Sequence, residues 1–347
     1  ANMGLIWCQS KALGCPQFVR WGFASSRAYG KLAAELKELS GIDTGYAPTG
    51  GIIPCLGEAE LEARAQFIEK LRAETEDGTY PASVLSRKEL EGMLPKVPFG
   101  PEVSGGIWSD MDGYVDPLHL MFAFRKSFVR LGGTLVARER VSEVKPSGKG
   151  YAVVCGGRTL ECGKAVLAAG LGVRKLAAQL GTDIPVFPNK SQVMLLERIP
   201  ADVLPIPLLG IARTFGGTVM IGAAHENMGM DRRLTPEVLA ANAQWAVRVW
   251  PELERKRILR FWTGLRVWPK DAYPIYDRIP GHENAFVFAM HSAVSLAAIL
   301  EQALPDYVMG KPLPPDGAIF GLSRFAGGAS GFQGSAASSP HAEAPNK

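Results

Sequence analysis

The sequence predicts a mixed α/β protein, in which a mainly parallel part is interrupted by an antiparallel sheet. Segments with helical spacing alternate with short apolar runs up to residue 180, as in a parallel sheet covered by helices. From Val186 to Thr263 the apolar runs are short, which indicates an antiparallel sheet with helices on one side. A chain of 347 residues can bury about 75% of its unfolded surface, so we expect two interwoven domains.

The first predicted helix runs from Pro16 to Ser40, because its apolar residues recur at steps of three and four. Gly41 follows it and is the residue type that commonly ends a helix. A strand and two further helices are predicted within the first hundred residues: a strand at 46–56, a charged helix at 58–76, and a short helix opened by the capping box of Ser86 and Glu89.

The segment Asp112–Pro117 leads into a predicted helix at 118–131. Asp116 is interpreted as its N-cap, with Pro117 at the first helical position, and not as a catalyst. Strands and one helix then alternate: a strand at 132–136 continuing at 141–144, a hairpin at 151–154 and 158–160, a strand at 164–170, and a helix at 173–180.

In the last part of the chain, Thr235 and Pro236 are predicted to open a helix that carries Trp245 and Trp250. The other predicted elements are short strands at 193–196 and 218–221, a buried strand at 286–290, and an apolar helix that begins at 293. Residues 326–347 are Gly, Ala, Ser and Pro without periodicity, so we expect a disordered tail.

Composition argues against several classes of protein. The formal charge of +4 arises from 38 basic and 34 acidic residues without a dense basic run, so a nucleic-acid surface is poorly supported. The five cysteines form no Cys-x-x-Cys pair, and neither a metal-ligand spacing nor a Gly-x-Ser-x-Gly elbow occurs. No apolar run reaches about 18 residues and no secretion signal is visible. We therefore expect a cytoplasmic protein without a metal site, and association with the inner face of the membrane stays open.

Several ordered segments resemble one known family: Asp112–Pro117, 221–224, Trp262–Arg266 and Phe286–Ser292. They are similar to the flavin-dependent amine and D-amino-acid oxidoreductases, which include glycine oxidase, sarcosine oxidase and the flavin subunits of bacterial amino-acid dehydrogenases. The resemblance covers nearly all of residues 1–325. It implies FAD as the cofactor and a small amino or imino acid as the substrate.

The resemblance also implies a division into domains. A Rossmann-like FAD-binding domain would comprise 1–20, 104–185 and 264–325, and an antiparallel substrate domain would comprise 21–103 and 186–263. No Gly-x-Gly-x-x-Gly follows a strand, so we expect the FAD-binding domain to be truncated, without its first strand–helix–strand unit. Because the sequence begins at Ala1, we interpret the chain as a fragment or a processed protein.

The cofactor contacts follow from matching this chain to the family's segments. Taken by itself, the turn at 168–172 is also explained by a purely structural role, since any tight strand-to-helix turn favours glycine. Where family members read Gly-His-x-Gly, this chain has Met290–Ala293, which lacks both glycines. The residues expected to contact FAD are Val141, Ala169, Gly170, Gly172, Lys190, Gln192, His291, Ser292, Ala293, Val294 and Ser295.

Arg266 is the main candidate for binding substrate. In the family the arginine of this motif clamps the substrate carboxylate, and a guanidinium pairs bidentately with a planar anion. The alternative is an ordinary salt bridge. His225 and Tyr273 are expected to contact the substrate, and His291 is the second catalytic candidate, although a lone histidine is more often structural.

The implied reaction is hydride transfer from the substrate carbon to the flavin, in which the protein fixes geometry and electrostatics. The similarity is greatest to subunits of hetero-oligomeric dehydrogenases that act on opines, hydroxyproline or glycine, so we expect partner subunits that carry the electrons onward. The alternative function is a degenerate subunit that keeps the fold for assembly and binds no flavin.

Overall fold

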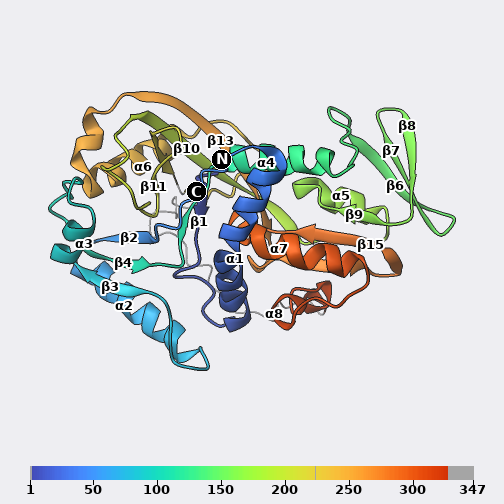
Figure 1. The fold of residues 1–347 in the computed structure, drawn as a ribbon, viewed down its shortest axis with the longest axis horizontal. Coiled ribbons are helices and arrows are strands. Elements are labelled where there is room, and N and C mark those ends of the chain that lie inside the picture. Colours follow the sequence, from blue (N-terminus) through green and yellow to red (C-terminus); the bar gives the residue numbers. More distant parts are fainter. Residues whose placement is uncertain (1, 223, 327–347) are drawn as a thin grey trace.

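The computed structural model describes residues 2–222 and 224–326. Figure 1 shows a sheet with its helices at one end of the molecule and a three-stranded meander at the other, with α1 (Pro16–Ser40) between them. Of the predicted tail at 326–347, only Ala326 lies within the described residues.

The larger sheet joins two sets of antiparallel strands. One set has the order β2 (Gly51–Leu56), β4 (Val103–Ser109), β3 (Ser83–Ser86), and the other β11 (Ile211–Arg213), β12 (Thr218–Gly222), β10 (Val186–Arg198), β13 (Ile258–Pro269). Leu208 forms single bridges to Ile52 and to Ile211 and so connects the sets. The helical segments of this part are α2 (Glu58–Ala73), α3 (Arg87–Met93), α6 (Pro236–Val249) and the 3-10 helix η2 (Pro251–Arg255).

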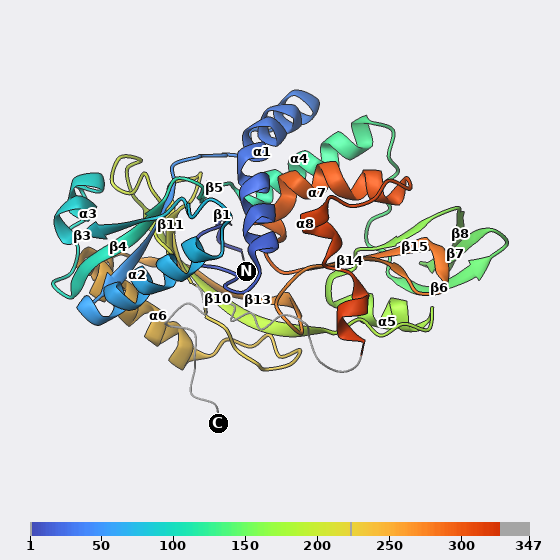
Figure 2. The ribbon, with the colours of Figure 1, turned by 90° about the horizontal axis from the view of Figure 1, so that it is seen from below.

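β10 and β13 are much longer than the short strands predicted there. They pair from Val186 with Pro269 to Leu196 with Ile258, and Figure 2 shows them running side by side. Met194, Leu196 and Trp245 belong to one buried apolar cluster in this part. A strand that packs against such a core along its length extends beyond its most apolar residues. The most apolar residues alone therefore predict a strand that is too short.

The second sheet has the order β14 (Ile275–Ile279), β15 (His282–Ala289), β9 (Ala165–Leu167). Among the strand pairs of the described residues, only β9 and β15 are parallel. The expectation of a mainly parallel sheet was therefore wrong for this part of the chain, because most strands pair with a neighbour in sequence. The meander β6 (Val141–Ser147), β7 (Gly150–Cys155), β8 (Arg158–Cys162), the 3-10 helix η1 (Gly170–Gly172) and α5 (Val173–Ala178) complete this region.

The centre of the molecule is helical. α1 packs against α4 (Pro117–Arg130), α7 (Ala293–Val308) and α8 (Pro315–Ala318). The short pair β1 (Leu5–Ile6) and β5 (Gly113–Tyr114) lies beside them, and the 3-10 helix η3 (Leu322–Phe325) follows α8. The boundary predicted between residues 20 and 21 falls inside α1, and the division into domains stays a proposal.

Local signals placed the helix ends well. α1 has the predicted bounds, and Gly41 ends it in the left-handed conformation. Both halves of the capping box of Ser86 and Glu89 are formed, and the Asp116 carboxylate accepts from the N–H groups of Leu118 and His119. The strand predicted at 132–136 was wrong. These residues form a turn and an irregular segment, and Val136 is 40% exposed, so its β-branched side chain is not packed as in a strand interior.

Candidate active site

The site lies where β9 and β15 end. Val287 pairs with Leu167 in parallel register, so the turn after β9 and the turn after β15 emerge at the same edge of the sheet. Gly170 has a positive φ of 58°, and a Cβ there would meet Val267 of β13 at 3.5 Å. The turn at 168–172, the turn at 290–292 and β13 thus converge on one region, which is the place where open α/β sheets bind ligands.

Arg266 projects from β13 toward β10. It lies opposite Asn189 in the register, and because side chains alternate along a strand, Asn189 and Ser191 share its face. Nη2 of Arg266 donates to Oγ of Ser191 at 2.9 Å, and Nη1 lies 2.8 Å from the ring nitrogens of His225.

Within the described residues, Arg266 forms no ion pair with an acidic side chain, and burial lowers the pKa of its guanidinium to about 10. A desolvated charge is costly unless it is paired. A negatively charged ligand would supply the missing partner.

A row of aromatic contacts leads from Arg266 to the turn after β15. His225 meets Trp268 edge to face at a centroid distance of 5.2 Å, and Trp268 stacks on His291 at 4.4 Å with an interplanar angle of 14°. The structure therefore brings three predicted residues, Arg266, His225 and His291, into one site. Trp268 connects them, although the sequence analysis did not assign it to the site.

Both histidines are neutral at neutral pH. Burial, and then the charge of Arg266, lower the pKa of His225 to about 3. Burial lowers the pKa of His291 well below its usual range, with further contributions from Lys11, Arg266 and His225. Nδ1 of His225 lies 3.0 Å from Oδ1 of Asn189. A neutral ring that donates from Nδ1 to Asn189 and accepts at Nε2 from Arg266 satisfies both contacts.

The first turn of α7 borders the same region. Ser292 occupies its N-cap with a φ of 60°, and its side chain does not cap the helix. Oγ of Ser292 lies 2.6 Å from Nδ1 of His291. Among the residues expected to contact FAD, Ala293 is exposed, Val294 is partly buried and Ser295 is buried. Oγ of Ser295 accepts from the N–H of Trp7 at 3.0 Å, so this residue ties the start of the chain to α7.

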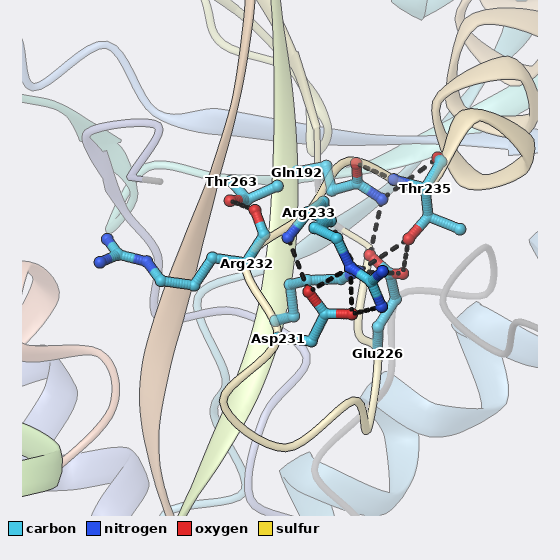
Figure 3. Close-up of polar contacts among 8 residues, drawn as sticks. Gln192, Glu226, Asp231, Arg232, Arg233, Thr235 and Thr263 are labelled. Atoms are coloured by element: carbon cyan, nitrogen blue, oxygen red, sulfur yellow. Dashed lines mark hydrogen bonds and ion pairs between the residues drawn. The ribbon is translucent and has the colours of Figure 1, made fainter.

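Lys190 and Gln192 face away from Arg266. Figure 3 shows the cluster to which Gln192, Glu226 and Thr235 belong. Nε2 of Gln192 donates to Glu226 at 2.7 Å, and Nζ of Lys190 lies 3.1 Å from the same carboxylate and 2.7 Å from the Thr235 hydroxyl. Lys190 and Gln192 are fully buried. Both residues therefore lie in a buried cluster of hydrogen-bonded polar side chains, on the face of the sheet opposite Arg266. There they contact Glu226, the residue that follows His225.

The other predicted residues lie on three further segments. Val141 begins β6, and Ala169 precedes η1, which ends at Gly172, in the turn after β9. Tyr273 packs edge to face on Phe18 at 5.3 Å and belongs to an aromatic cluster. The expected contact of Tyr273 with the substrate stays a prediction.

Lys11 also belongs to this region, and the sequence analysis missed it. Its Nζ donates to the carbonyl of Trp7 at 2.8 Å, and burial lowers its pKa. Asn189 and Ser191 were missed too, although the two-residue period of a strand would have placed them beside Arg266 had the register been known. The sequence around Lys11 offers no comparable signal.

The residues present fit a flavin. The isoalloxazine ring has a flat face and several acceptor atoms, and the N–H groups in the first turn of a helix lack intrahelical partners. The first turn of α7, the stacked pair of Trp268 and His291, and the uncrowded backbone at Gly170 and Gly172 would supply matching groups. No group of three metal-binding side chains occurs among the residues described. Likewise, none of the described helices has both the length and the hydropathy needed to cross a membrane.

Comparison with known proteins identifies the family of the chain. Residues 1–300 match the family described as FAD dependent oxidoreductase (DAO), and the chain belongs to this family. It is 32% identical over 326 residues to a subunit of opine oxidase from Rhizobium meliloti, covering 94% of this chain and 87% of that protein. It is 28% identical to the hydrogen cyanide synthase subunit HcnC of Pseudomonas aeruginosa, covering 89% and 75%.

Among solved structures, glycine oxidase from Geobacillus kaustophilus has the same fold. It superposes with a TM-score of 0.85 at 24% sequence identity, and the match covers 94% of this chain and 88% of that one. The expected family, cofactor and fold class are thereby confirmed: the protein is an FAD-dependent oxidoreductase.

Proposed function

We propose that the protein dehydrogenates a small amino or imino acid at its carbon–nitrogen bond, with Arg266 binding the substrate carboxylate. The observation that supports this most is the charge of Arg266, which has no acidic partner among the described residues and is desolvated. Ser191 and His225 hold the guanidinium from two sides. A fixed, planar guanidinium suits a carboxylate, which it can bind through two parallel hydrogen bonds.

The other residues of the site set the electrostatics around the substrate. Bound FAD would supply the oxidant by taking up the hydride. The charges of Arg266 and Lys11 disfavour a further positive charge nearby, so they would help a substrate ammonium group to lose its proton. Neutral His225 and His291 add no charge of their own, and Trp268 between them covers the site with an apolar surface.

We further propose that a partner protein takes the electrons onward. Two of the relatives are named as subunits, one of opine oxidase and one, HcnC, of hydrogen cyanide synthase, which supports an enzyme that works within an assembly. Oxygen would then be a poor electron acceptor.

The test is anaerobic reduction of the FAD-loaded protein by candidate amino and imino acids, followed in the visible absorbance of the flavin. Reduction by a carboxylate-bearing amine, and fast reoxidation by an artificial dye but not by air, is the expected result. Rapid reoxidation by air with stoichiometric hydrogen peroxide would instead identify an oxidase. Failure of the purified protein to take up FAD would favour the alternative, a structural subunit without flavin.

A further inference from the structure

Phe187 is an exposed aromatic residue near the start of β10. Its side chain is 44% exposed. Phe187 lies directly opposite Trp268 in the register of β10 and β13, so both side chains project from the same face, with their β-carbons about 4.5–5.5 Å apart. Trp268 in turn stacks on His291 at 4.4 Å. A row of three aromatic side chains therefore leads from the turn after β15 to the surface.

The exposed ring of Phe187 is flanked by a cation. The guanidinium carbon of Arg174 lies 5.6 Å from the ring centroid, and Nε of Arg174 donates to Asp183 at 2.8 Å. Arg174 is itself exposed, and the ring of Phe187 stays accessible to water beside it. Aromatic residues and arginine are enriched in the interfaces at which proteins bind one another. This combination is therefore typical of a docking surface.

The charges around Phe187 are mainly positive. Arg174 and Lys175 are exposed on α5. Lys270 is exposed after β13, and its N–H donates to the carbonyl of the residue that precedes β10 at 2.9 Å. From residue 164 to 196 the sequence has one acidic residue, and this is the partner of Arg174. A surface of this kind attracts proteins with acidic surfaces and brings them to it faster.

We propose that Phe187, Arg174, Lys175 and Lys270 form the surface on which a one-electron redox protein with an acidic surface docks and receives electrons. This inference rests on the proposed function, in which a partner takes the electrons onward, and adds the docking surface and the kind of partner. Electron transfer slows steeply with the separation of two redox groups, and His291 is expected to contact FAD. An acceptor docked on this surface would therefore lie at the outer end of the row that reaches the cofactor side.

The transfer balances over two acceptor molecules. Each acceptor gains one electron, the reduced cofactor loses two electrons, and its protons pass to water. The three aromatic side chains are not oxidised in this process. They determine where the acceptor comes closest to the cofactor, so Phe187 and Arg174 act in docking and not in the oxidation of the substrate.

Two electron acceptors of opposite charge test the proposal. An acidic plastocyanin and a basic cytochrome c both accept one electron. The FAD-loaded protein is reduced photochemically without air, so that the result does not depend on the substrate, and is then mixed with either acceptor. Reoxidation by plastocyanin should be faster by about 10-fold or more at low ionic strength. The difference should shrink as salt screens the charges.

Variants of the surface locate the contact. Phe187→Ser should slow reoxidation by plastocyanin and weaken its binding, measured by calorimetric titration with the oxidised acceptor, by about 5- to 30-fold, the range of an interface hot spot. Arg174→Gln should do the same mainly at low salt. Phe215→Ser changes a phenylalanine that is 49% exposed between β11 and β12, and Arg257→Gln changes an exposed arginine paired with an acid. Both are matched controls and should have no effect.

Two further readouts show that the site itself is intact. Sarcosine is a substrate candidate, and methylthioacetate has sulfur in place of its nitrogen, so it binds without dehydrogenation of a C–N bond. Its dissociation constant should be equal in Phe187→Ser and in the unchanged protein. Reoxidation by a small artificial dye should be equal too, because a dye needs no docking surface.

The outcomes separate this inference from the proposed function. Equal binding of plastocyanin by Phe187→Ser, Arg174→Gln and the unchanged protein would place the acceptor elsewhere and overturn the docking proposal, while substrate oxidation at Arg266 would stand. Equal slowing of dye and plastocyanin would mean that Phe187 acts on the cofactor, which also overturns it. If Phe187→Ser instead changes the sedimentation of the protein, this surface joins two copies and the proposal is wrong. Rapid reoxidation of every variant by air would contradict the proposed function itself.

Discussion

Replacement of Arg266 by lysine tests how the carboxylate is held. The guanidinium contacts Ser191 through Nη2 and His225 through Nη1, so its plane is fixed before a ligand arrives. A lysine ammonium at this position keeps the charge but cannot present two parallel donors. The variant should therefore bind carboxylates through a single hydrogen bond.

The size of the effect follows from the lost contact. A hydrogen bond to a charged group contributes about 1.5–3 kcal/mol, so the dissociation constant of a monocarboxylate should rise roughly 10- to 150-fold. Arg266→Met removes the charge as well and should weaken binding further. Arg260 lies on the same strand, is exposed and contacts only the ring of Trp262 among the interactions described for it. Arg260→Lys is therefore the matched control.

Two measurements decide the outcome. Titration of the FAD-loaded variants with methylthioacetate gives the dissociation constant, and steady-state kinetics with sarcosine gives KM. The visible flavin spectrum without ligand should be the same in all variants, because Arg266 acts on the substrate. If Arg266→Lys leaves both the dissociation constant and KM unchanged for every carboxylate, Arg266 does not bind the substrate.

Three further predictions concern the support of the site. Glu226→Gln removes one partner of a buried pair and leaves Lys190 charged and uncompensated, so the free energy of unfolding should fall by about 3–5 kcal/mol. A change below about 1 kcal/mol in urea unfolding, the size of an ordinary substitution, would contradict this. His225 has a folded-state pKa of about 3 against an ordinary value of 6.5, so the unfolded chain binds its proton first and stability should decline as the pH falls from 6.5 toward 3. His225→Gln should show a smaller decline over the same window, and equal slopes would refute the assignment. Asp116→Ala removes the N-cap of α4 and should lower the free energy of unfolding by about 1 kcal/mol without changing KM; an altered KM would point to a role beyond capping.

Helix ends were predictable because they depend on neighbours in sequence. The capping box of Ser86 and Glu89, the N-cap Asp116 and the C-cap Gly41 each combine a residue type with a local backbone requirement. Strand partners depend on distant residues, and this explains the errors in the predicted strands. The segment at 132–136 has β-branched residues but no strand pairing, and the length of β10 reflects its pairing with β13.

The site residues that could be predicted from the sequence are those that stand within a recognisable motif. Arg266 and His291 stand in motifs that resemble those of the family, and the structure brings them together through Trp268. The resemblance selected Lys190 and Gln192, whereas the structure places Asn189 and Ser191 on the face of Arg266. Which of two alternating sets faces a ligand depends on the register between distant strands, and one sequence does not specify it.

The alternation along β10 has a consequence for how this protein tolerates changes of length. Asn189 and Ser191 lie on the side of Arg266, and Lys190 and Gln192 anchor the opposite side. Insertion or deletion of one residue inside β10 would turn a buried lysine toward Arg266 and direct a serine into the Glu226 cluster. Such a change would disrupt the contacts on both faces of the strand at once, whereas a substitution affects only one face. Natural and engineered length variation should therefore be confined to exposed connections such as residues 148–149 between β6 and β7.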